Sequence, residues 1–582
     1  MRQGKVSFEE TVDAFGGIDR RGVGGKPDAA WEMCNFRVAG DGSLCRREGY
    51  APFCQFEGQV RGVWSGYLDG CDVILAVAGN GLYRVVELAG SAAATKLFSL
   101  TTTAGKVMFF YLDGYVYLMD GAAIYSYDGT TVGYANCYAP LYGKLWDPTR
   151  KGAVNEELNA FSRCVRISYK TALTTSTLTV GMKIAAVDGI FADNTSWLDA
   201  SQYSISEDGL SVNLTTSYAS GHLLLVYLRL ASEAMQDTSV LTSCNEVTIY
   251  GGEFDDRVFL YHGSSAADIY YSHRVSEEQM AECRAVWTGQ SNLYFTMGQK
   301  ITVGGGCSEV TGLCRHYDRL LIFRHDGASM ASLADGKVPD AVYPTMPVNS
   351  TVGCVSPEAI ALYGNDPVTV CEKGIFRWRQ TTDERDECNA VCISEKVAKL
   401  PFLQDVSGVY SVAWYTRGEV WFYKPGDTQG QVLVCAPGRG IWYLYDGIYA
   451  GGMFLFRDEM CFYGGTSLYR FSSGNAADTY GGEAKSIVGK ATFPALEVGS
   501  ATVEKRLMRV YLTCGGGGSW QVKLKTDRGI EDAFTVAVPQ GSERTLETVR
   551  LSAGRFVHGA LTLTASGSAG QRLYGMTIRC GS

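Results

Sequence analysis

Long hydrophobic runs, helical periodicity and dense charge are all scarce in this sequence. No apolar run approaches the roughly 20 residues that a membrane-spanning helix needs. Residues 1–6 are too polar to begin a signal peptide. We therefore expect synthesis in the cytosol and no membrane insertion. Helical periodicity is confined to one short stretch, residues 276–285, which favours an all-β protein.

The low charge content narrows the possible functions. Charged residues make up 19% of the chain, below the usual share of about 25%. The net charge is −9, and Lys and Arg form no cluster along the sequence. Proteins that grip nucleic acid usually carry a basic patch, so this composition argues against that function.

The cysteine content is too low for a disulfide-built scaffold. The 18 cysteines amount to about 3% of the chain. Several lie inside apolar runs, where a thiol serves as a small hydrophobic group: Cys371, Cys435, Cys461 and Cys514. We expect mostly free, buried thiols.

Glycine and tyrosine, in contrast, are abundant, with 69 and 34 residues. Residues 414–471 show the pattern most clearly. Aromatic or β-branched runs of about 4–6 residues alternate there with Gly, Asp, Asn or Pro. This pattern predicts antiparallel strands joined by tight turns.

Hairpins of this kind recur along the chain. Their turns begin at Asp69, Asp113, Asp255, Tyr317, Gly364, Arg417 and Arg457. Five of the six successive offsets lie between 40 and 62 residues, near the blade repeat of a β-propeller. We predict a propeller of six or seven blades; the number depends on whether the Asp69 and Asp113 hairpins belong to separate blades.

The remaining offset, 142 residues between Asp113 and Asp255, is too long for one blade and predicts an insertion. Period-two strand patterns within it suggest a small β-sandwich, and insertions at loop tips are thermodynamically cheap. A polar linker, residues 473–479, precedes six more strand patterns that suit a second sandwich of jelly-roll or immunoglobulin-like topology. The predicted divisions are an N-terminal arm with first strands (1–50), propeller (51–140), inserted sandwich (141–245), propeller (246–475) and C-terminal sandwich (476–582).

Metal-site candidates are weak. Cys307, Cys314 and His316 form one group, and Cys388 with Cys392 another, but neither has the paired spacing of a zinc site. We expect no metal and no cofactor.

Catalytic candidates are carboxylates, because propellers host glycosidases that work with paired acids. The candidates are Asp255 with Asp256, Asp318 with Asp326, and Glu384 with Asp386. Carboxylates at hairpin turns are more often solvated turn formers. We predict a non-enzymatic protein.

Aromatic residues in the 414–471 stretch could stack on sugars or pack the blades. The set comprises Trp421, Trp442, Tyr443, Tyr445, Tyr463 and Tyr469. Their place in alternating strands favours packing.

Several ordered motifs resemble those of one protein family. Near the N-terminus they are Phe15-Gly16-Gly17-Ile18-Asp19, Asn35-Phe36, Gly42-Ser43-Leu44 and Arg46-Arg47-Glu48-Gly49-Tyr50. Further along they are Gly353-Cys354-Val355-Ser356-Pro357, Gly374-Ile375-Phe376-Arg377-Trp378, Ile393-Ser394-Glu395-Lys396-Val397 and Gly440-Ile441-Trp442-Tyr443. This order resembles the propeller-bearing tail nozzle, or packaged-DNA stabilisation, proteins of tailed bacteriophages. Thr466-Ser467 departs from the pattern, since such hairpins often carry Gly there.

The resemblance implies a virion tail component made in the host cytoplasm. Such a protein would form a ring, typically six-fold, below the portal and adaptor proteins, and would carry tail fibres. It would close the DNA exit channel, and genomic DNA would pass through the lumen without specific binding. An acidic chain suits a conduit wall, because it repels phosphate.

Two other functions remain open from the sequence. One is a carbohydrate-binding propeller that acts as an adhesin or tail-fibre component through Trp421 or Trp442. The other, less favoured, is a glycoside hydrolase.

Overall fold

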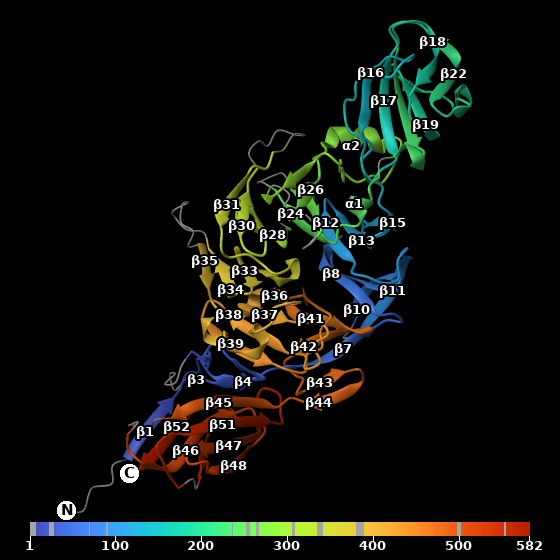
Figure 1. Ribbon diagram of the computed structural model, residues 1–582. Coiled ribbons are helices and arrows are strands. Elements are labelled where there is room, and N and C mark those ends of the chain that lie inside the picture. The colour runs from blue at the N-terminus through green and yellow to red at the C-terminus, as the bar shows by residue number, and fades with distance from the viewer. Residues whose placement is uncertain are drawn as a thin grey trace, which may run out of the picture.

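The molecule is elongated, with a propeller in the middle and a smaller β-domain at each end (Figure 1). This computed structural model describes residues 7–21, 28–68, 70–88, 91–235, 237–251, 256–263, 267–304, 309–333, 342–379, 389–496, 502–551 and 554–581. Within these ranges, α-helix is confined to α1 (Ser239–Thr242) and α2 (Glu277–Arg284). The all-β prediction is confirmed.

The helix expected at residues 276–285 is α2. Its N-terminus is capped by Ser276, whose hydroxyl accepts a hydrogen bond from the backbone N–H of Gln279. Gln279 in turn caps the Ser276 backbone, completing a capping box.

Four-stranded antiparallel sheets are the repeating unit of the propeller. Four of them are β8–β11 (Val60–Leu68, Cys71–Ala78, Gly81–Leu88, Ser91–Ser99), β12–β15 (Met108–Leu112, Tyr115–Met119, Ile124–Tyr127, Val132–Tyr134), β24–β27 (Glu246–Tyr250, Arg257–Tyr261, Asp268–Tyr271, Lys300–Thr302) and β28–β31 (Gly312–His316, Arg319–Phe323, Ala328–Ala331, Thr345–Asn349). The others are β32–β35 (Ile360–Tyr363, Asp366–Cys371, Gly374–Trp378, Ala390–Cys392), β36–β39 (Tyr410–Trp414, Glu419–Tyr423, Val432–Ala436, Ile441–Tyr445), and β40–β42 (Gly452–Phe456, Glu459–Gly464, Ser467–Ser472) completed by β7 (Gly49–Gln55).

The first strands of these sheets form a closed ring. Each contacts the first strand of the next sheet, in the order β8, β12, β24, β28, β32, β36 and β40, and β40 contacts β8 again. The described residues thus place seven groups of four antiparallel strands around one axis, of which β36–β39 continues into a larger sheet, and the Asp113 hairpin lies in a different group from β8 and β9. The predicted propeller fold is confirmed.

The last sheet is closed by a strand from the other end of the chain. β7 pairs with β42, from Ser467 opposite Gln55 to Ser472 opposite Gly49. The first and last parts of the propeller sequence therefore share one sheet, which closes the ring without leaving a free seam.

The hairpin turns named from the sequence join the first and second strands of the sheets. Arg457 and Asp458 both have positive φ, 49° and 61°, as the type I′ turn of a two-residue hairpin requires. Tyr317 also has positive φ, 54°. Asp69 and Asp255 lie outside the described residues.

The inserted β-domain consists of two sheets that enclose their own core. One contains β16 (Leu141–Trp146), β17 (Cys164–Lys170), β23 (Leu223–Leu230), β19 (Ile184–Ala192) and β20 (Ser196–Trp197). The other contains β18 (Thr175–Thr179), β22 (Ser211–Tyr218) and β21 (Tyr203–Ile205). All eight strands lie within the predicted insertion, residues 141–245.

The C-terminal sandwich has all six strands expected from the sequence, with additional strands. One sheet contains β49 (Thr545–Val549), β46 (Lys505–Gly515), β52 (Arg572–Gly581), β6 (Leu44–Arg46) and β5 (Phe36–Val38), with β1 (Ser7–Val12) beside β52 and β50 (Arg555–Phe556) beside β46. The other contains β4 (Glu32–Cys34), β45 (Gly489–Leu496), β51 (Gly559–Ser566), β47 (Gly518–Thr526) and β48 (Glu531–Val538).

Two details of the predicted organisation differ from the structure. The N-terminal segment, expected as an arm before the first sheet, instead supplies strands β1, β4, β5 and β6 to the C-terminal sandwich. The expected linker at residues 473–479 runs into a hairpin of β43 (Ala477–Tyr480) and β44 (Glu483–Ser486). The first difference comes from pairing between distant parts of the chain, which local patterns do not report, whereas the second is a short local hairpin.

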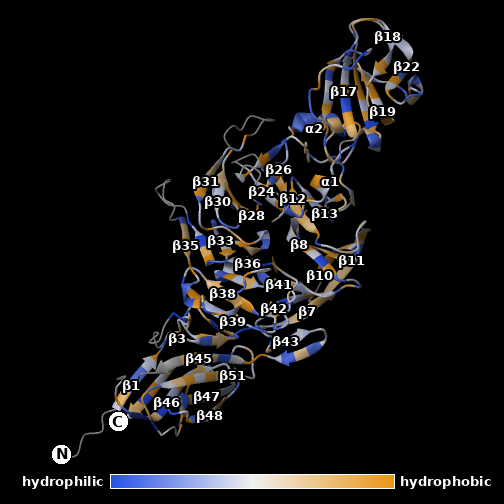
Figure 2. Cartoon of the chain, in the orientation of Figure 1, coloured by the Kyte–Doolittle hydropathy of each residue, from blue (hydrophilic) through white to orange (hydrophobic). Residues whose placement is uncertain are grey.

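Propeller and C-terminal sandwich are continuous. β4 lies beside β39 through the Leu444–Cys34 bridge and beside β45, so one sheet runs from the propeller into the sandwich. One hydrophobic cluster includes both Trp442 of the propeller and Trp520 of the sandwich. Apolar residues run through the strands of both domains in Figure 2.

Candidate functional site

Three of the six aromatic residues considered for sugar stacking, Trp421, Trp442 and Tyr443, lie in the propeller core. Trp421 is 1% exposed, and Trp442 and Tyr443 are fully buried. The Trp442 indole donates a hydrogen bond to the Ile393 carbonyl (3.1 Å). No face of these rings is open to a sugar, so in this structure they serve packing.

A buried carboxylate, which sequence reasoning missed, holds two of these rings. Glu419 begins β37 and is 2% exposed. It accepts hydrogen bonds from the Trp421 indole (3.0 Å) and from the Tyr443 hydroxyl. Burial raises the pKa of Tyr443 well above its usual value, with Glu419 adding to the effect. The sequence signal for this buried carboxylate was a single glutamate at the start of an otherwise apolar strand.

The proposed catalytic carboxylates lie at separate surface turns. Asp318 has an 80% exposed side chain beside Arg319. Asp326 and Asp256 are also exposed. Asp255, Glu384 and Asp386 lie outside the described residues.

The proposed metal ligands are used locally. The Cys314 thiol donates to the Arg315 carbonyl (3.4 Å), and the His316 ring contacts the Asn365 carbonyl (2.7 Å). Cys392 lies 3.7 Å from the Ser394 hydroxyl. Cys307 and Cys388 fall outside the described part of the chain. All 16 described cysteines are free and 12 of them are buried, as expected.

A charged cluster crosses the propeller axis. The Lys106 ammonium contacts Glu246 and Glu358, the latter at 2.9 Å. Lys106 precedes β12, Glu246 begins β24 and Glu358 precedes β32. Because β12 and β32 are not neighbours in the ring of first strands, these ion pairs must span the central opening at one face.

The electrostatics of this axial cluster are unusual for a surface. Glu246 and Glu358 have side chains only 14% and 21% exposed. Burial raises the pKa of Glu246 to about 7, opposed by Lys106 and reinforced by Glu358. Two acids with separated pKa values flank one ammonium group. These three charged residues lie far apart in the sequence and form no motif, so no pattern in the chain pointed to them.

A second polar network joins the propeller, the N-terminal segment and the β43–β44 hairpin. Asn35, with a left-handed φ of 56°, accepts from Arg47 Nε (2.8 Å) and donates to Asp446 (2.6 Å). Arg47 also forms an ion pair with Asp478, and the two side chains are 2% and 9% exposed. A charge pair this buried is stable only with its full set of partners.

The residues around Arg47 extend this junction. Arg46 donates to the carbonyls of Ile487 (2.8 Å) and Gly567 (2.9 Å) in the sandwich. Glu48 forms an ion pair with Arg417, and the Tyr50 hydroxyl donates to the Gly447 carbonyl (2.6 Å). The Arg46–Tyr50 motif therefore binds the propeller to the sandwich.

Comparison with known proteins shows only distant likeness. No protein-family profile and no curated protein sequence matches this chain. PorZ, described as an essential bacterial surface component of the type-IX secretion system of Porphyromonas gingivalis, is 9% identical, with a TM-score of 0.35 over 86% of this chain and 46% of PorZ. The WD40 domain of SCAP from fission yeast (8%, TM-score 0.31, 75% and 94% covered) and the Dos1 propeller (11%, TM-score 0.35, 74% and 95% covered) are similarly distant. This chain thus spans less than half of PorZ, and these likenesses carry no argument about function.

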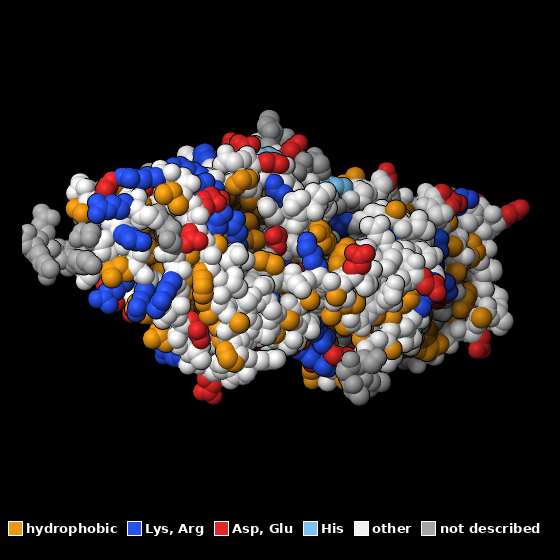
Figure 3. Space-filling model, turned by 90° about the horizontal axis from the view of Figure 1, so that it is seen from below, with side chains coloured by type: hydrophobic (Ala, Val, Ile, Leu, Met, Phe, Trp, Pro, Cys, Tyr) orange, Lys and Arg blue, Asp and Glu red, His pale blue; other side chains and the backbone are white. Residues whose placement is uncertain are grey.

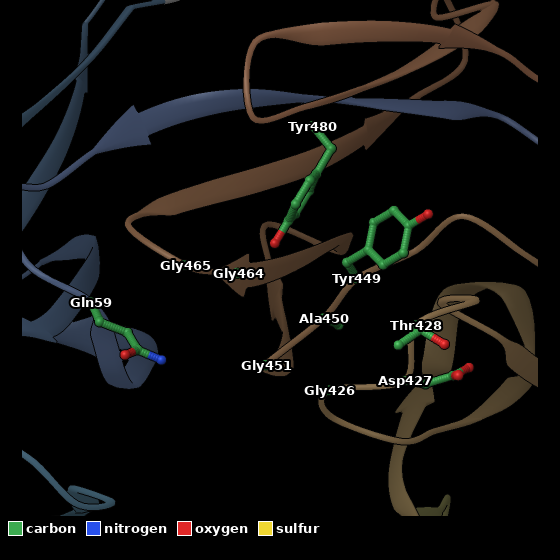
Figure 4. Close-up of a pocket in the computed structure, with 10 residues that line it drawn as sticks. All are labelled: Gln59, Gly426, Asp427, Thr428, Tyr449, Ala450, Gly451, Gly464, Gly465 and Tyr480. Carbon is green, nitrogen blue, oxygen red and sulfur yellow. The ribbon is translucent and has the colours of Figure 1, made fainter.

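A surface pocket of 520 Å³ lies beside the last two sheets of the propeller (Figure 4). Four of its ten lining residues are glycines. Its one carboxylate, Asp427, accepts hydrogen bonds from the backbone N–H groups of Gln429 and Gln431. The pocket therefore offers shape but few free functional groups.

The described residues contain neither a cluster of metal ligands nor a membrane-spanning helix. No group of three or more His, Cys, Asp or Glu there is arranged to hold a metal ion. No helix there is long and apolar enough to cross a membrane.

Proposed function

We propose that this protein is a non-enzymatic structural component of a bacteriophage tail. In this proposal it is a nozzle or hub subunit that forms a ring, closes the DNA exit channel and anchors fibres. Its partners are further copies of itself, the tail adaptor or portal-side proteins and the fibre proteins. Genomic DNA passes through the lumen without specific binding.

The observation that carries this proposal is the fused junction of propeller and sandwich. A shared sheet, a shared core and the Arg47–Asp478 pair join the two domains. A subunit that transmits force between neighbours needs domains that do not move independently. Arg46–Tyr50, one of the motifs in the family resemblance, supplies much of this joint.

The axial cluster supports the same proposal. Lys106 and its two glutamates span the centre of the propeller at one face. The DNA path would then be the lumen enclosed by several subunits rather than the axis of one propeller. A net charge of −9 disfavours adhesion of phosphate to that wall.

Electron microscopy of the purified full-length protein tests the proposal. We expect rings with a central hole, and incubation with host-type polysaccharides should release no sugar. Particles that stay single at every concentration would contradict the ring.

The Glu246–Glu358 pair favours a second function, glycoside hydrolysis. An acid with a pKa of about 7 beside a second carboxylate is a common feature of catalytic sites. Polysaccharide cleavage that is abolished in Glu246→Gln and retained in Glu277→Gln would establish this function. The buried Trp421 and Trp442 give no support to the carbohydrate-binding alternative.

A further inference from the structure

One outer face of the C-terminal sandwich is rich in arginine. It is formed by β1, β52, β46 and β50, and its exposed residues include Arg506, Arg509, Arg555 and Arg579. Tyr511 on β46 accepts hydrogen bonds from Arg509 on the same strand and from Arg579 on β52, and these bonds lower the pKa of its hydroxyl. Lys and Arg side chains gather over this sandwich in Figure 3.

The pairing of these strands sets like charges against each other. Arg506 lies directly opposite Arg555, and Arg509 lies directly opposite Arg579. Like charges in directly opposed positions destabilise a sheet. Two such pairs on one face therefore cost stability in the isolated molecule.

Little negative charge on the same face compensates them. Glu9 is opposite Arg579 in the register, and Arg555 lies 3.9 Å from Glu504. Among the ion pairs of the described residues, none involves Arg506, Arg509 or Arg579. Locally unfavourable charge of this kind is typical of a surface that meets an acidic partner.

Charge is divided unevenly along the chain. Residues 476–582 contain 13 Lys and Arg against 9 Asp and Glu, a net charge of +4. The remaining 475 residues contain the other 39 Lys and Arg and the other 52 Asp and Glu, a net charge of −13. The molecule thus carries both a basic face and a large acidic body.

We propose that this arginine face, defined by Arg506, Arg509, Arg555 and Arg579, binds the acidic propeller of a second copy of this chain. A contact between two different surfaces of identical subunits repeats from copy to copy and closes into a ring when the rotation permits. Nucleic acid is the less favoured occupant, because the −13 body of the same molecule would repel it. This inference rests on the proposed ring and assigns its contact surface.

Charge reversal in the full-length protein tests whether the arginine face mediates self-association. Arg509→Glu with Arg579→Glu should move the midpoint of self-association, measured by sedimentation velocity, to at least about tenfold higher concentration. The matched control is Lys523→Glu with Lys525→Glu, on β47 of the opposite sheet, which should leave the midpoint unchanged. Arg509→Lys with Arg579→Lys should retain association, and circular dichroism should show that every variant is folded.

The outcomes separate this inference from the proposed function. If rings form equally well in the Arg509/Arg579 charge-reversal variant, the arginine face is not the contact surface, although the proposed ring stands. A wild-type protein that stays monomeric overturns both. A fluorescent random-sequence DNA duplex probes the alternative partner. If the wild-type protein binds this duplex, and that binding is lost in the charge-reversal variant while self-association is unchanged, the partner of this face is nucleic acid and not a second copy.

Discussion

Gly49, in the Arg46–Tyr50 motif, has no room for a side chain. A Cβ atom there would lie 2.1 Å from the carbonyl oxygen of Ala477, in the hairpin beside β7. Gly40, nine residues earlier, has open space around the same position. The requirement for glycine at position 49 is therefore local.

Gly49→Ala should lower the free energy of unfolding by about 1–3 kcal/mol, because backbone must shift to admit the methyl group. Gly40→Ala should change it by less than about 0.5 kcal/mol. Chemical denaturation of both variants checks this, and equal stabilities would contradict the close packing of β7 on the hairpin.

Glu246 gives the axial cluster a predictable pH dependence. The folded protein binds this proton more tightly than the unfolded chain, since burial raises the pKa from 4.5 to about 7. The stabilisation from protonated Glu246 is therefore complete below about pH 4.5 and is lost as the pH rises through about 7. Lys106 and Glu358 face the same group.

Between pH 5 and pH 8, wild type should lose roughly 2 kcal/mol of stability relative to Glu246→Gln. Glu277→Gln is the control, because that side chain is 93% exposed. Thermal unfolding across this range measures the difference. Parallel curves for wild type and Glu246→Gln would show that the axial carboxyl does not titrate as described.

At the scale of elements, the closure of the propeller by β7 is the main feature. β7 is separated from its partner β42 by about 400 residues of chain, so the pairing is entirely long-range. Strands that complete a closed ring should open only with the whole domain.

Backbone amides of β7 should therefore exchange with solvent as slowly as those of β41 and β42. Hydrogen-exchange mass spectrometry of the full-length protein measures this. Fast exchange confined to β7 would mean that the ring opens at this strand.

Local pattern predicted those elements that local turns build. The turns at Tyr317 and Arg457 were predicted correctly and join the first and second strands of their sheets. Turn residues such as Gly, Asp and Asn mark hairpins because of their own backbone preferences, which do not depend on the rest of the fold. The pattern did not show that β1 and β7 pair with strands hundreds of residues away. It also described Asp478 as part of a linker, because burial beside Arg47 comes only from tertiary packing.

The candidate site was predicted less well than the fold. The aromatic residues Trp421, Trp442 and Tyr443 lie in the core, as their alternation favoured. Lys106, Glu246 and Glu358 were missed, since single charged residues far apart in sequence show no motif until the ring brings them together.

At the scale of the whole molecule, the propeller and C-terminal sandwich form one continuous body with the inserted sandwich at the far end (Figure 1). An acidic body and a basic terminal face give such a subunit two complementary surfaces. We propose that these two surfaces bring copies of the chain together in a structural ring.

Mass photometry of the untagged full-length protein, over a range of concentrations, measures whether copies assemble in this way. We expect a dominant closed species at an integer multiple of 63.2 kDa, at least a trimer, which dissociates in high salt. A single 63.2 kDa species under every condition would contradict it.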